Sequence, residues 1–385
     1  MKSPKTDLAI YIHWPFCKSK CPYCDFNSHV SEAIDHNQWK QAYIKEISHY
    51  ARKFDNRNVT SIFFGGGTPS LMRPEVVEEI INAITKYWKI SSQIEITLEA
   101  NPTSVEVEKL RAIKAAGVNR ISMGVQSFND KNLKFLGRGH SSEEAKSALR
   151  EVRRIYDNYS FDIIYALPGQ SLDELNSEIK TALSLSANHL SLYQLTIEKG
   201  TPFFADHASG KFILPDEDMS TQMYELVESS LSKVGLENYE VSNYAKPGFE
   251  SRHNLTYWRY GEFLGIGPGA HGRLRRSTNI EATVNIHKPE KWLSSVLEKG
   301  SGVQKRDEID SQSVLEEFLI MGLRLKSGIS NDNFINEIGS RPEEVLDFSS
   351  LRKHGLIEAD ELGFRATKSG RLVLNSVIAK LLQDK

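Results

Sequence analysis

The chain has 385 residues, of which 39% are hydrophobic and 25% are charged, and its formal net charge is −2. This balance is typical of a globular protein with a sizeable core, and it argues against a general electrostatic affinity for nucleic acid or anionic membranes. No run approaches the about 20 apolar residues of a membrane-spanning helix, and the first residues lack a secretory signal. We therefore expect a cytoplasmic protein with no nucleic-acid partner.

The first two hundred residues alternate between short β-rich runs and longer amphipathic segments such as Pro74–Trp88 and Val105–Ala116. This alternation predicts βα units and a parallel sheet, and six units favour an open partial barrel over a closed eight-stranded one. Chemistry in such sheets collects at the carboxyl ends of the strands. The predicted strands are Leu8–Trp14, Val59–Phe64, Glu95–Leu98, Arg120–Val125, Phe161–Leu167 and His189–Ile197.

The pattern changes after residue 200. Pro215–Val234 reads as a helix, whereas Tyr239–Gly272 is rich in Gly, Tyr, Asn and Trp, lacks clear periodicity and is interpreted as a functional loop region. From about Ser311 the sequence predicts helices, a short hairpin and a last helix over Arg371–Leu382, as in a small, mainly helical winged-helix-like domain. The predicted organisation is a partial (β/α)6 barrel over residues 1–210, a barrel-completing region over 211–305 and the winged-helix-like domain over 306–385.

The cysteines are the most informative residues. There are three, and they form a C-x3-C-x2-C motif of Cys17, Cys21 and Cys24 directly after the first predicted strand. Such a loop can place three thiolates on three irons of a [4Fe–4S] cluster and leaves the fourth iron open for S-adenosylmethionine (SAM). The alternative is zinc with His13 or His29 as a fourth ligand, but structural zinc usually has two ligand pairs separated by a longer loop.

The motif resembles the radical-SAM superfamily, and further segments narrow the resemblance. These segments are similar to those of the family of oxygen-independent coproporphyrinogen III oxidases and their heme-chaperone relatives. The resemblance runs from about residue 8 to the C-terminus. The segments are IYIHWPFCKSKCPYCDFNSH, FFGGGTPSLM, EANP, RISMGVQSF, LGRGH, DIIYALPGQ, YQLTIEKGTP, NYAKPGF, HNLTYW and GIGPGAHG.

The strand ends in these segments carry the candidate SAM residues. Glycines after the second strand expose backbone groups to a ligand, and a carboxylate at Glu99 can accept hydrogen bonds from ribose or pair with the SAM ammonium. Taken alone, each has a plainer reading, a tight turn for the glycines and a helix N-terminal acid for Glu99. The resemblance assigns Tyr11, Cys17, Cys21, Cys24, Gly66 and Glu99 to the cluster and a first SAM, and Tyr23, Gly67, Thr68, Gln126, Arg138 and Asp162 to positions that hold a second SAM in the decarboxylating enzyme.

The HNLTYW segment resembles the heme-binding motif of the chaperone branch, which implies heme contacts by His253, Tyr257 and Trp258. Imidazole is a common axial ligand of heme iron, and Tyr and Trp offer flat surfaces to a porphyrin. The alternative is an aromatic loop with a hydrogen-bonded His253. Nearby cations that could meet heme propionates, or simply form a solvated face, are Arg273, Arg275 and Arg276.

Two departures favour the chaperone branch over the decarboxylase. Phe26 stands where the decarboxylase pattern has a fourth cysteine, and ten residues precede Tyr11, too few for the decarboxylase's N-terminal extension. The resemblance therefore implies a heme-binding radical-SAM protein that delivers heme to acceptor apoproteins, such as membrane respiratory enzymes, with a reductant for the cluster. The alternative is the oxidative decarboxylase of porphyrin biosynthesis. SAM binding and reductive cleavage are expected in both.

Overall fold

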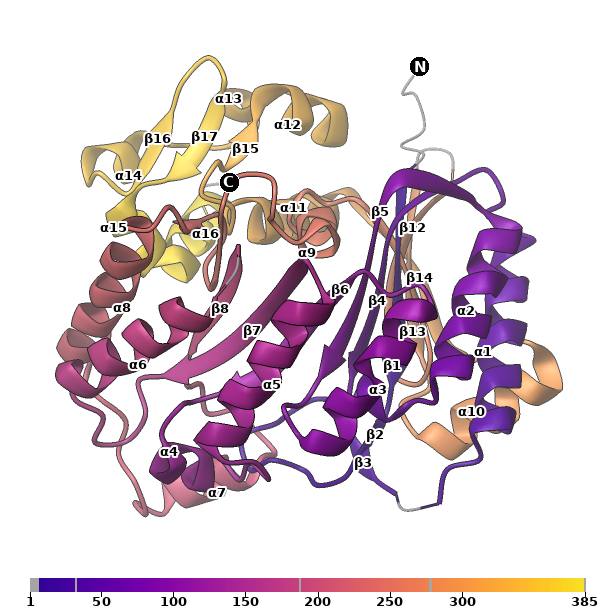
Figure 1. Cartoon of the computed structure of the whole chain (residues 1–385). Coiled ribbons are helices and arrows are strands. Elements are labelled where there is room, and N and C mark those ends of the chain that lie inside the picture. The colour runs from indigo at the N-terminus through magenta and orange to yellow at the C-terminus, as the bar shows by residue number, and fades with distance from the viewer. Residues whose placement is uncertain (1–6, 32, 187, 277–278, 384–385) are drawn as a thin grey trace.

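The computed structural model describes residues 7–31, 33–186, 188–276 and 279–383, and a large central sheet organises them (Figure 1). Six parallel strands stand side by side in chain order, which confirms the predicted parallel sheet. They are β1 (Asp7–Trp14), β4 (Asn58–Gly66), β5 (Lys89–Ala100), β6 (Arg120–Gln126), β7 (Asn158–Tyr165) and β8 (His189–Gln194).

The alternation of residues along these strands separates an apolar face from a polar one. In β5, Ile96 and Leu98 belong to the main apolar core, while Thr97 and Glu99 point to the opposite side. Helices cover the apolar face in Figure 1, so the polar face lines the inside of the barrel. The helices of this part are α1 (His36–Ala51), α2 (Pro74–Tyr87), α3 (Ser104–Ala115), α4 (Asp130–Phe135), α5 (Ser142–Ile155), α6 (Leu172–Leu185), α7 (Pro202–Ala208) and α8 (Glu217–Ser232), with a 3-10 turn η1 (Pro69–Leu71).

The segment predicted as a loop region, Tyr239–Gly272, forms strands and a helix instead, and this part of the prediction is wrong. Its strands add to both edges of the sheet: β10 pairs antiparallel with β8, whereas β11 pairs parallel with β1. Long-range pairing of this kind leaves little local periodicity, because β10 and β11 are only three and five residues long. The elements of this segment and its surroundings are β9 (Glu237–Asn238), β10 (Asn243–Ala245), α9 (Arg252–Trp258), β11 (Glu262–Ile266), β12 (His271–Arg276), β13 (Asn279–Asn285), α10 (Pro289–Lys299) and β14 (Val303–Ile309).

The sheet stays open, as expected for a partial barrel. Its order is β14-β13-β12-β11-β1-β4-β5-β6-β7-β8-β10-β9, so that β14 and β9 are its two edges within the described residues. None of the described helices is long and apolar enough to cross a membrane. The N-terminal residues on which the absence of a secretory signal partly rests, 1–6, lie outside the described residues.

The C-terminal part has its own apolar core and a small three-stranded sheet, of which β16 and β17 form the predicted hairpin. Phe318, Phe334 and Phe364 lie in that core, which also takes in Tyr260 and Ile280 from the barrel side. The predicted boundaries at residues 210/211 and 305/306 stay predictions. The elements are α11 (Ser311–Gly322), β15 (Ile329–Ser330), α12 (Asn331–Ile338), α13 (Pro342–Val345), α14 (Ser349–Lys353), β16 (Ile357–Ala359), β17 (Gly363–Ala366), α15 (Lys368–Leu372) and α16 (Leu374–Gln383).

Candidate functional site

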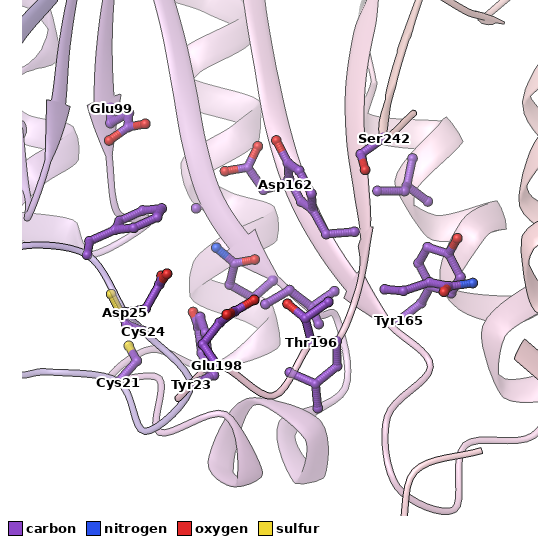
Figure 2. A pocket seen from close by; sticks show the side chains of 18 of the residues that line it. Cys21, Tyr23, Cys24, Asp25, Glu99, Asp162, Tyr165, Thr196, Glu198 and Ser242 are labelled. Carbon is purple, nitrogen blue, oxygen red and sulfur yellow. The ribbon is translucent and has the colours of Figure 1, made fainter. Parts of the chain in front are cut away.

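The cysteine loop opens onto a large cavity inside the barrel. The loop follows β1 and is tied back by a short parallel pair, β2 (Phe16–Cys17) with β3 (His29–Val30). The cavity has a volume of about 1560 Å³. Figure 2 shows Cys21 and Cys24 on one side of it, facing Glu99 and Asp162 across the opening.

The structure brings most of the predicted site residues to this one cavity, although they come from six separate segments. Tyr11, His253, Tyr257 and Trp258 are not among the residues that line it. Those that do are Cys17, Cys21, Tyr23, Cys24, Gly66, Gly67, Thr68, Glu99, Gln126, Arg138 and Asp162.

Hydrogen-bond donors surround the thiols. The Thr68 hydroxyl donates to Cys17 Sγ at 3.4 Å, and Arg138 Nη1 donates to Cys21 Sγ at 3.4 Å. Such donors stabilise thiolates and tune the potential of a cluster bound to them. Burial raises the pKa of the Cys17 and Cys24 thiols, so metal binding has to displace their protons.

The three thiols are the sulfur donors that the cavity offers to a metal cluster. They all line one cavity and no other cysteine exists in the chain. The donor set, three sulfurs with no fourth protein ligand of this kind, is the set that an open-cornered [4Fe–4S] cluster requires.

The glycines after β4 allow the chain to approach the cysteine loop closely. Gly66 has φ of +112°, a conformation that side-chain-bearing residues rarely adopt. A Cβ on Gly67 would lie 2.7 Å from the Phe16 carbonyl oxygen, closer than contact allows. Any side chain here would push the strand end away from the loop that carries Cys17.

Two buried carboxyl groups face the cavity. Burial and the nearby Asp162 raise the pKa of Glu99 to about 8, although its Oε2 accepts a hydrogen bond from the Gly66 N–H at 3.1 Å. Burial raises the pKa of Asp162 to about 6, and Arg120 and Arg138 oppose that rise. A cationic ligand would favour the ionised form of both groups, as the positively charged ammonium and sulfonium of SAM do.

Polar atoms without partners mark the space beside these carboxyls. Gln126 Oε1 and Arg138 Nε are buried and make no hydrogen bond to any described residue. Gln126 also has φ of +74°, a strained conformation for glutamine. Since buried polar groups are normally paired, these atoms indicate a polar ligand at this end of the cavity.

Asn101 is a residue that the sequence reasoning did not assign. Its Oδ1 accepts from Arg138 Nη2 at 2.5 Å, and its Nδ2 donates to the Thr68 hydroxyl at 3.3 Å. It thus links the two residues that contact the cysteine sulfurs. The signal was present in the EANP segment, where Asn101 follows Glu99 by two positions.

Tyr11 lies behind the cavity wall. Its hydroxyl is 3.1 Å from His13 Nδ1, and burial raises its pKa. Its ring lies so close to Gly65 that a Cβ there would be 2.8 Å from it. A direct SAM contact by Tyr11 stays a prediction, and in this structure the Tyr11 ring packs against Phe63 and Gly65 of β4.

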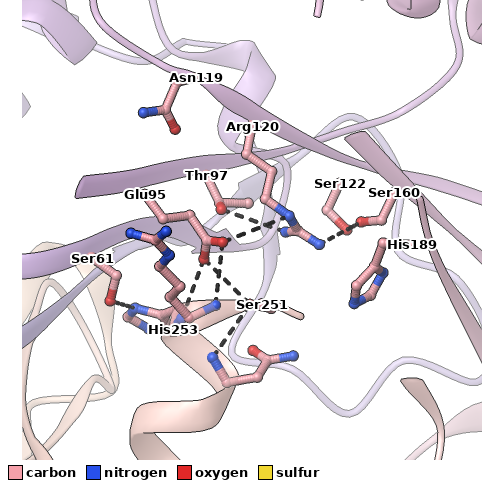
Figure 3. Close-up of polar contacts among 12 residues, drawn as sticks. Ser61, Glu95, Thr97, Asn119, Arg120, Ser122, Ser160, His189, Ser251 and His253 are labelled. Carbon is pink, nitrogen blue, oxygen red and sulfur yellow. Dashed lines mark hydrogen bonds and ion pairs between the residues drawn. The ribbon is translucent and has the colours of Figure 1, made fainter. Parts of the chain in front are cut away.

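The HNLTYW segment forms helix α9 and buries its histidine inside the barrel (Figure 3). The His253 side chain is 1% exposed, its Nδ1 is 2.9 Å from the Ser61 hydroxyl, and its Nε2 is 2.7 Å from the Tyr257 hydroxyl. The Glu95 carboxylate accepts from the backbone N–H groups of Arg252 and His253 at 3.2 Å. The structure therefore shows the hydrogen-bonded alternative, and axial ligation by His253 stays a prediction that requires α9 to move.

The arginines considered for propionate binding are paired with carboxylates. Arg273 forms a bidentate pair with Glu317 at 3.0 and 2.8 Å, and Arg275 lies 2.7 Å from Glu337. Both pairs join β12 to helices of the C-terminal part. Propionate binding by Arg273 and Arg275 is thus not supported by the structure, because their charges already join two parts of the chain. Arg276 is 51% exposed and pairs with Glu281 of β13 at 3.4 Å.

The burial of His253 predicts an acid-sensitive fold. Burial lowers the pKa of His253 to about 3, below the ordinary value of 6.5, so the unfolded chain binds this proton at a higher pH than the folded chain. As the pH falls from 6.5 towards 3, the free energy of unfolding should fall by up to about 1.4 kcal/mol per pH unit through this group. Above pH 6.5 the group is neutral in both states and has no such effect.

Chemical denaturation of the wild type and His253→Gln between pH 4 and 7 measures this. We expect a shallower decline with pH in the variant, and His207→Gln, a change on an exposed turn of α7, is the matched control. Parallel declines for all three proteins would contradict the prediction.

Comparison with known proteins agrees with this geometry. A model of the radical SAM superfamily matches residues 11–182, and a model of the HemN C-terminal domain matches residues 309–373. The heme chaperones HemW of Bacillus subtilis and Escherichia coli are each 35% identical to this chain, over 98% of the chain and 99% and 98% of their own lengths. The mitochondrial radical S-adenosyl methionine domain-containing protein 1 of Bos taurus is 36% identical over 97% of this chain and 87% of its own length.

Among solved structures, the coproporphyrinogen III oxidase HemN of Escherichia coli has the same fold. Its TM-score is 0.82 at 22% identity, over 99% of this chain and 91% of that chain. The fold and the site define a radical SAM protein, a class that uses SAM and a [4Fe–4S] cluster. Within that class, the chain belongs to the family that contains the heme chaperones HemW.

Proposed function

We propose that this protein is a heme chaperone, which binds a [4Fe–4S] cluster, SAM and heme and transfers the heme to acceptor apoproteins such as membrane respiratory enzymes. The observation that carries the proposal is the 35% identity to chaperones over nearly the whole chain, together with Phe26 in place of a fourth cysteine. Phe26 is 58% exposed and lines the cavity beside the cysteine loop. A reductant and an acceptor protein are the further partners of this proposal.

The cavity residues have separate roles in the proposal. Cys17, Cys21 and Cys24 hold the cluster, which when bound supplies one electron to the SAM sulfonium. Thr68 and Arg138 donate hydrogen bonds towards the sulfurs. The remaining assigned residues, Tyr11, Tyr23, Gly66, Gly67, Glu99, Gln126 and Asp162, form the SAM site.

The second candidate is the oxygen-independent coproporphyrinogen III oxidase. The fold shared with HemN is consistent with this activity, but one fold can serve several functions. The test is to reconstitute the cluster anaerobically, assay coproporphyrinogen decarboxylation and titrate heme by absorbance. We expect stoichiometric heme binding and no decarboxylation above the rate without protein. Robust decarboxylation would overturn the chaperone proposal.

SAM affinity should rise with pH because of Glu99. A carboxyl with a pKa of about 8 is mostly protonated at pH 6.5, and a cationic ligand binds better to the ionised form. The affinity should increase by up to about tenfold per pH unit between pH 6.5 and 8, then level off. Calorimetric titration of SAM into the cluster-loaded protein measures this, with Glu99→Gln as the variant.

Glu99→Gln should bind SAM weakly and with little dependence on pH over this range. The exposed Glu198, also in the cavity wall, provides the control Glu198→Gln, which should keep the wild-type profile. An identical pH profile in Glu99→Gln and the wild type would exclude Glu99 as the titrating group.

A further inference from the structure

The cavity is larger than one cofactor needs and has a second arm. Ligand pockets are typically about 300–1,000 Å³, against about 1560 Å³ here. In Figure 2, Tyr165 and Ser242 lie beyond Asp162, on the side away from Cys24 and Glu99. We call this part the distal arm and define it by Tyr165, Leu192, Tyr193, Leu195, Tyr224, Val241, Arg324, Arg371, Leu372 and Val373.

The lining of the distal arm differs from that of the cysteine end. It combines aliphatic and aromatic side chains and two arginines with uncharged polar residues such as Ser220, Thr221 and Ser242. Leu372, the last residue of α15, and Val373, which follows it, are 43% and 44% exposed although both are apolar. An apolar wall with a few placed cations is typical of a site for a flat apolar ligand that carries negative groups.

Arg324 is the cation that carries the argument. Its guanidinium lies 4.8 Å from the centre of the Trp258 ring and makes no hydrogen bond or salt bridge to any residue in the described ranges. Arg273 and Arg275, by contrast, are fully engaged with carboxylates. The charge of Arg324 lowers the pKa of the buried Glu240 carboxyl, but its Nε has no hydrogen-bond partner among the described residues. An arginine in a cavity wall with an unused donor is suited to bind a carboxylate, and stacking on an indole fixes its plane.

Arg371 of α15 is the second arginine that lines the distal arm. One of its nitrogens pairs with Glu228 at 3.1 Å, while Nε is buried without a partner. Lys368 shares the same Glu228 at 3.2 Å and lies 3.9 Å from Glu225, so these two cations and two carboxylates balance in charge. The unpartnered Nε of Arg371 is the donor that this cluster leaves available. The exposed Glu217 also lines the cavity.

We infer that the distal arm binds the tetrapyrrole through its carboxylates, with Arg324 as the carboxylate-binding residue and Trp258 as the residue that positions Arg324. This rests on the proposed function and deepens it. It gives Trp258 of the HNLTYW segment a role that does not require α9 to leave the barrel. Arg371 and the apolar pair Leu372–Val373 complete the site on the C-terminal side.

The experiment compares heme with its dimethyl ester, in which both propionates are blocked. Absorbance titrations use the cluster-loaded full chain as wild type, Arg324→Gln, and the control Arg259→Gln, an exposed arginine one residue after Trp258. We expect Arg324→Gln to weaken heme binding by about 10- to 100-fold and to leave the weaker ester binding unchanged, because one charge-assisted hydrogen bond is lost. Arg259→Gln should bind both as the wild type does.

Two further variants keep the test independent of a folding defect. Leu372→Asp places a negative charge at an exposed position of the arm and should weaken heme binding more than ester binding. Trp258→Leu should reduce the preference for heme over its ester, whereas a purely structural role would weaken both equally.

The failures of the two proposals are distinguishable. Suppose that the wild type binds heme. If Arg324→Gln weakens the binding of heme and of its ester equally, or weakens neither, the distal-arm assignment is overturned and the chaperone proposal stands. If the wild type binds no heme, both fall.

Discussion

Cys21→Ser should abolish the iron–sulfur cluster. A hydroxyl is a poor ligand for cluster iron, and no fourth cysteine exists to replace the lost thiolate. After anaerobic reconstitution, bound iron and sulfide should fall from cluster stoichiometry to near background, and SAM cleavage by a chemical reductant should be lost with them. Iron and sulfide analysis together with the visible absorbance of the cluster measures this.

Ser19→Ala is the matched control, because Ser19 is an exposed residue of the same loop. It should load the cluster as the wild type does. If Cys21→Ser retained a full complement of iron and sulfide, the assignment of Cys21 as a ligand would be wrong. If the wild type instead bound one zinc per chain and Cys21→Ser lost that zinc, the zinc alternative would regain support.

Glu46→Ala should have the largest effect on stability. Glu46 of α1 is fully buried and accepts hydrogen bonds from the backbone N–H groups of Gly267 at 3.0 Å and Gly302 at 2.8 Å, and from Trp292 Nε1 at 3.2 Å. Removal of the carboxylate leaves these buried donors without an acceptor, at about 1–3 kcal/mol each before water enters. We expect the free energy of unfolding to fall by roughly 3–5 kcal/mol.

Denaturant unfolding measures the loss. Glu79→Ala is the control, since Glu79 is 52% exposed and pairs only with Lys40 at 3.3 Å. It should change the free energy of unfolding by less than about 1 kcal/mol. Equal effects of the two substitutions would show that the hydrogen bonds of Glu46 do not stabilise the contact between α1 and the β11–α10 region.

Local sequence pattern was sufficient to predict the six central strands and most of the residues that line the cavity. In β5 the alternation of Ile96 and Leu98 with Thr97 and Glu99 is visible in the sequence and is the alternation of apolar outer and polar inner faces in the structure. The spacing of the cysteines places them on one loop, and the rule that loops at the carboxyl ends of parallel strands meet brings Glu99 and Gln126 to the same cavity. These features depend on neighbours in the chain.

The errors arose where distant segments meet. Nothing near Glu262–Ile266 tells that this short strand pairs with β1, because its partner lies about 250 residues away. Nothing local shows that Arg273 is neutralised by Glu317, or that both ring nitrogens of His253 are satisfied by Ser61 and Tyr257. Charge and residue type identify a candidate ligand, but only the tertiary contacts decide whether it is free to bind.

The pairing of β1 with β11 also has a consequence for how the protein is made. The cysteines follow β1 directly, whereas β11 ends at Ile266, about 240 residues later. At roughly 5–20 residues per second, a ribosome needs on the order of 12–50 s to reach that point. Throughout that interval the nascent chain carries three unshielded thiols on an unfinished sheet. We therefore expect iron and sulfide to be delivered after synthesis, once the second neighbour of β1 is in place. The cysteine loop is most exposed to oxidation during translation.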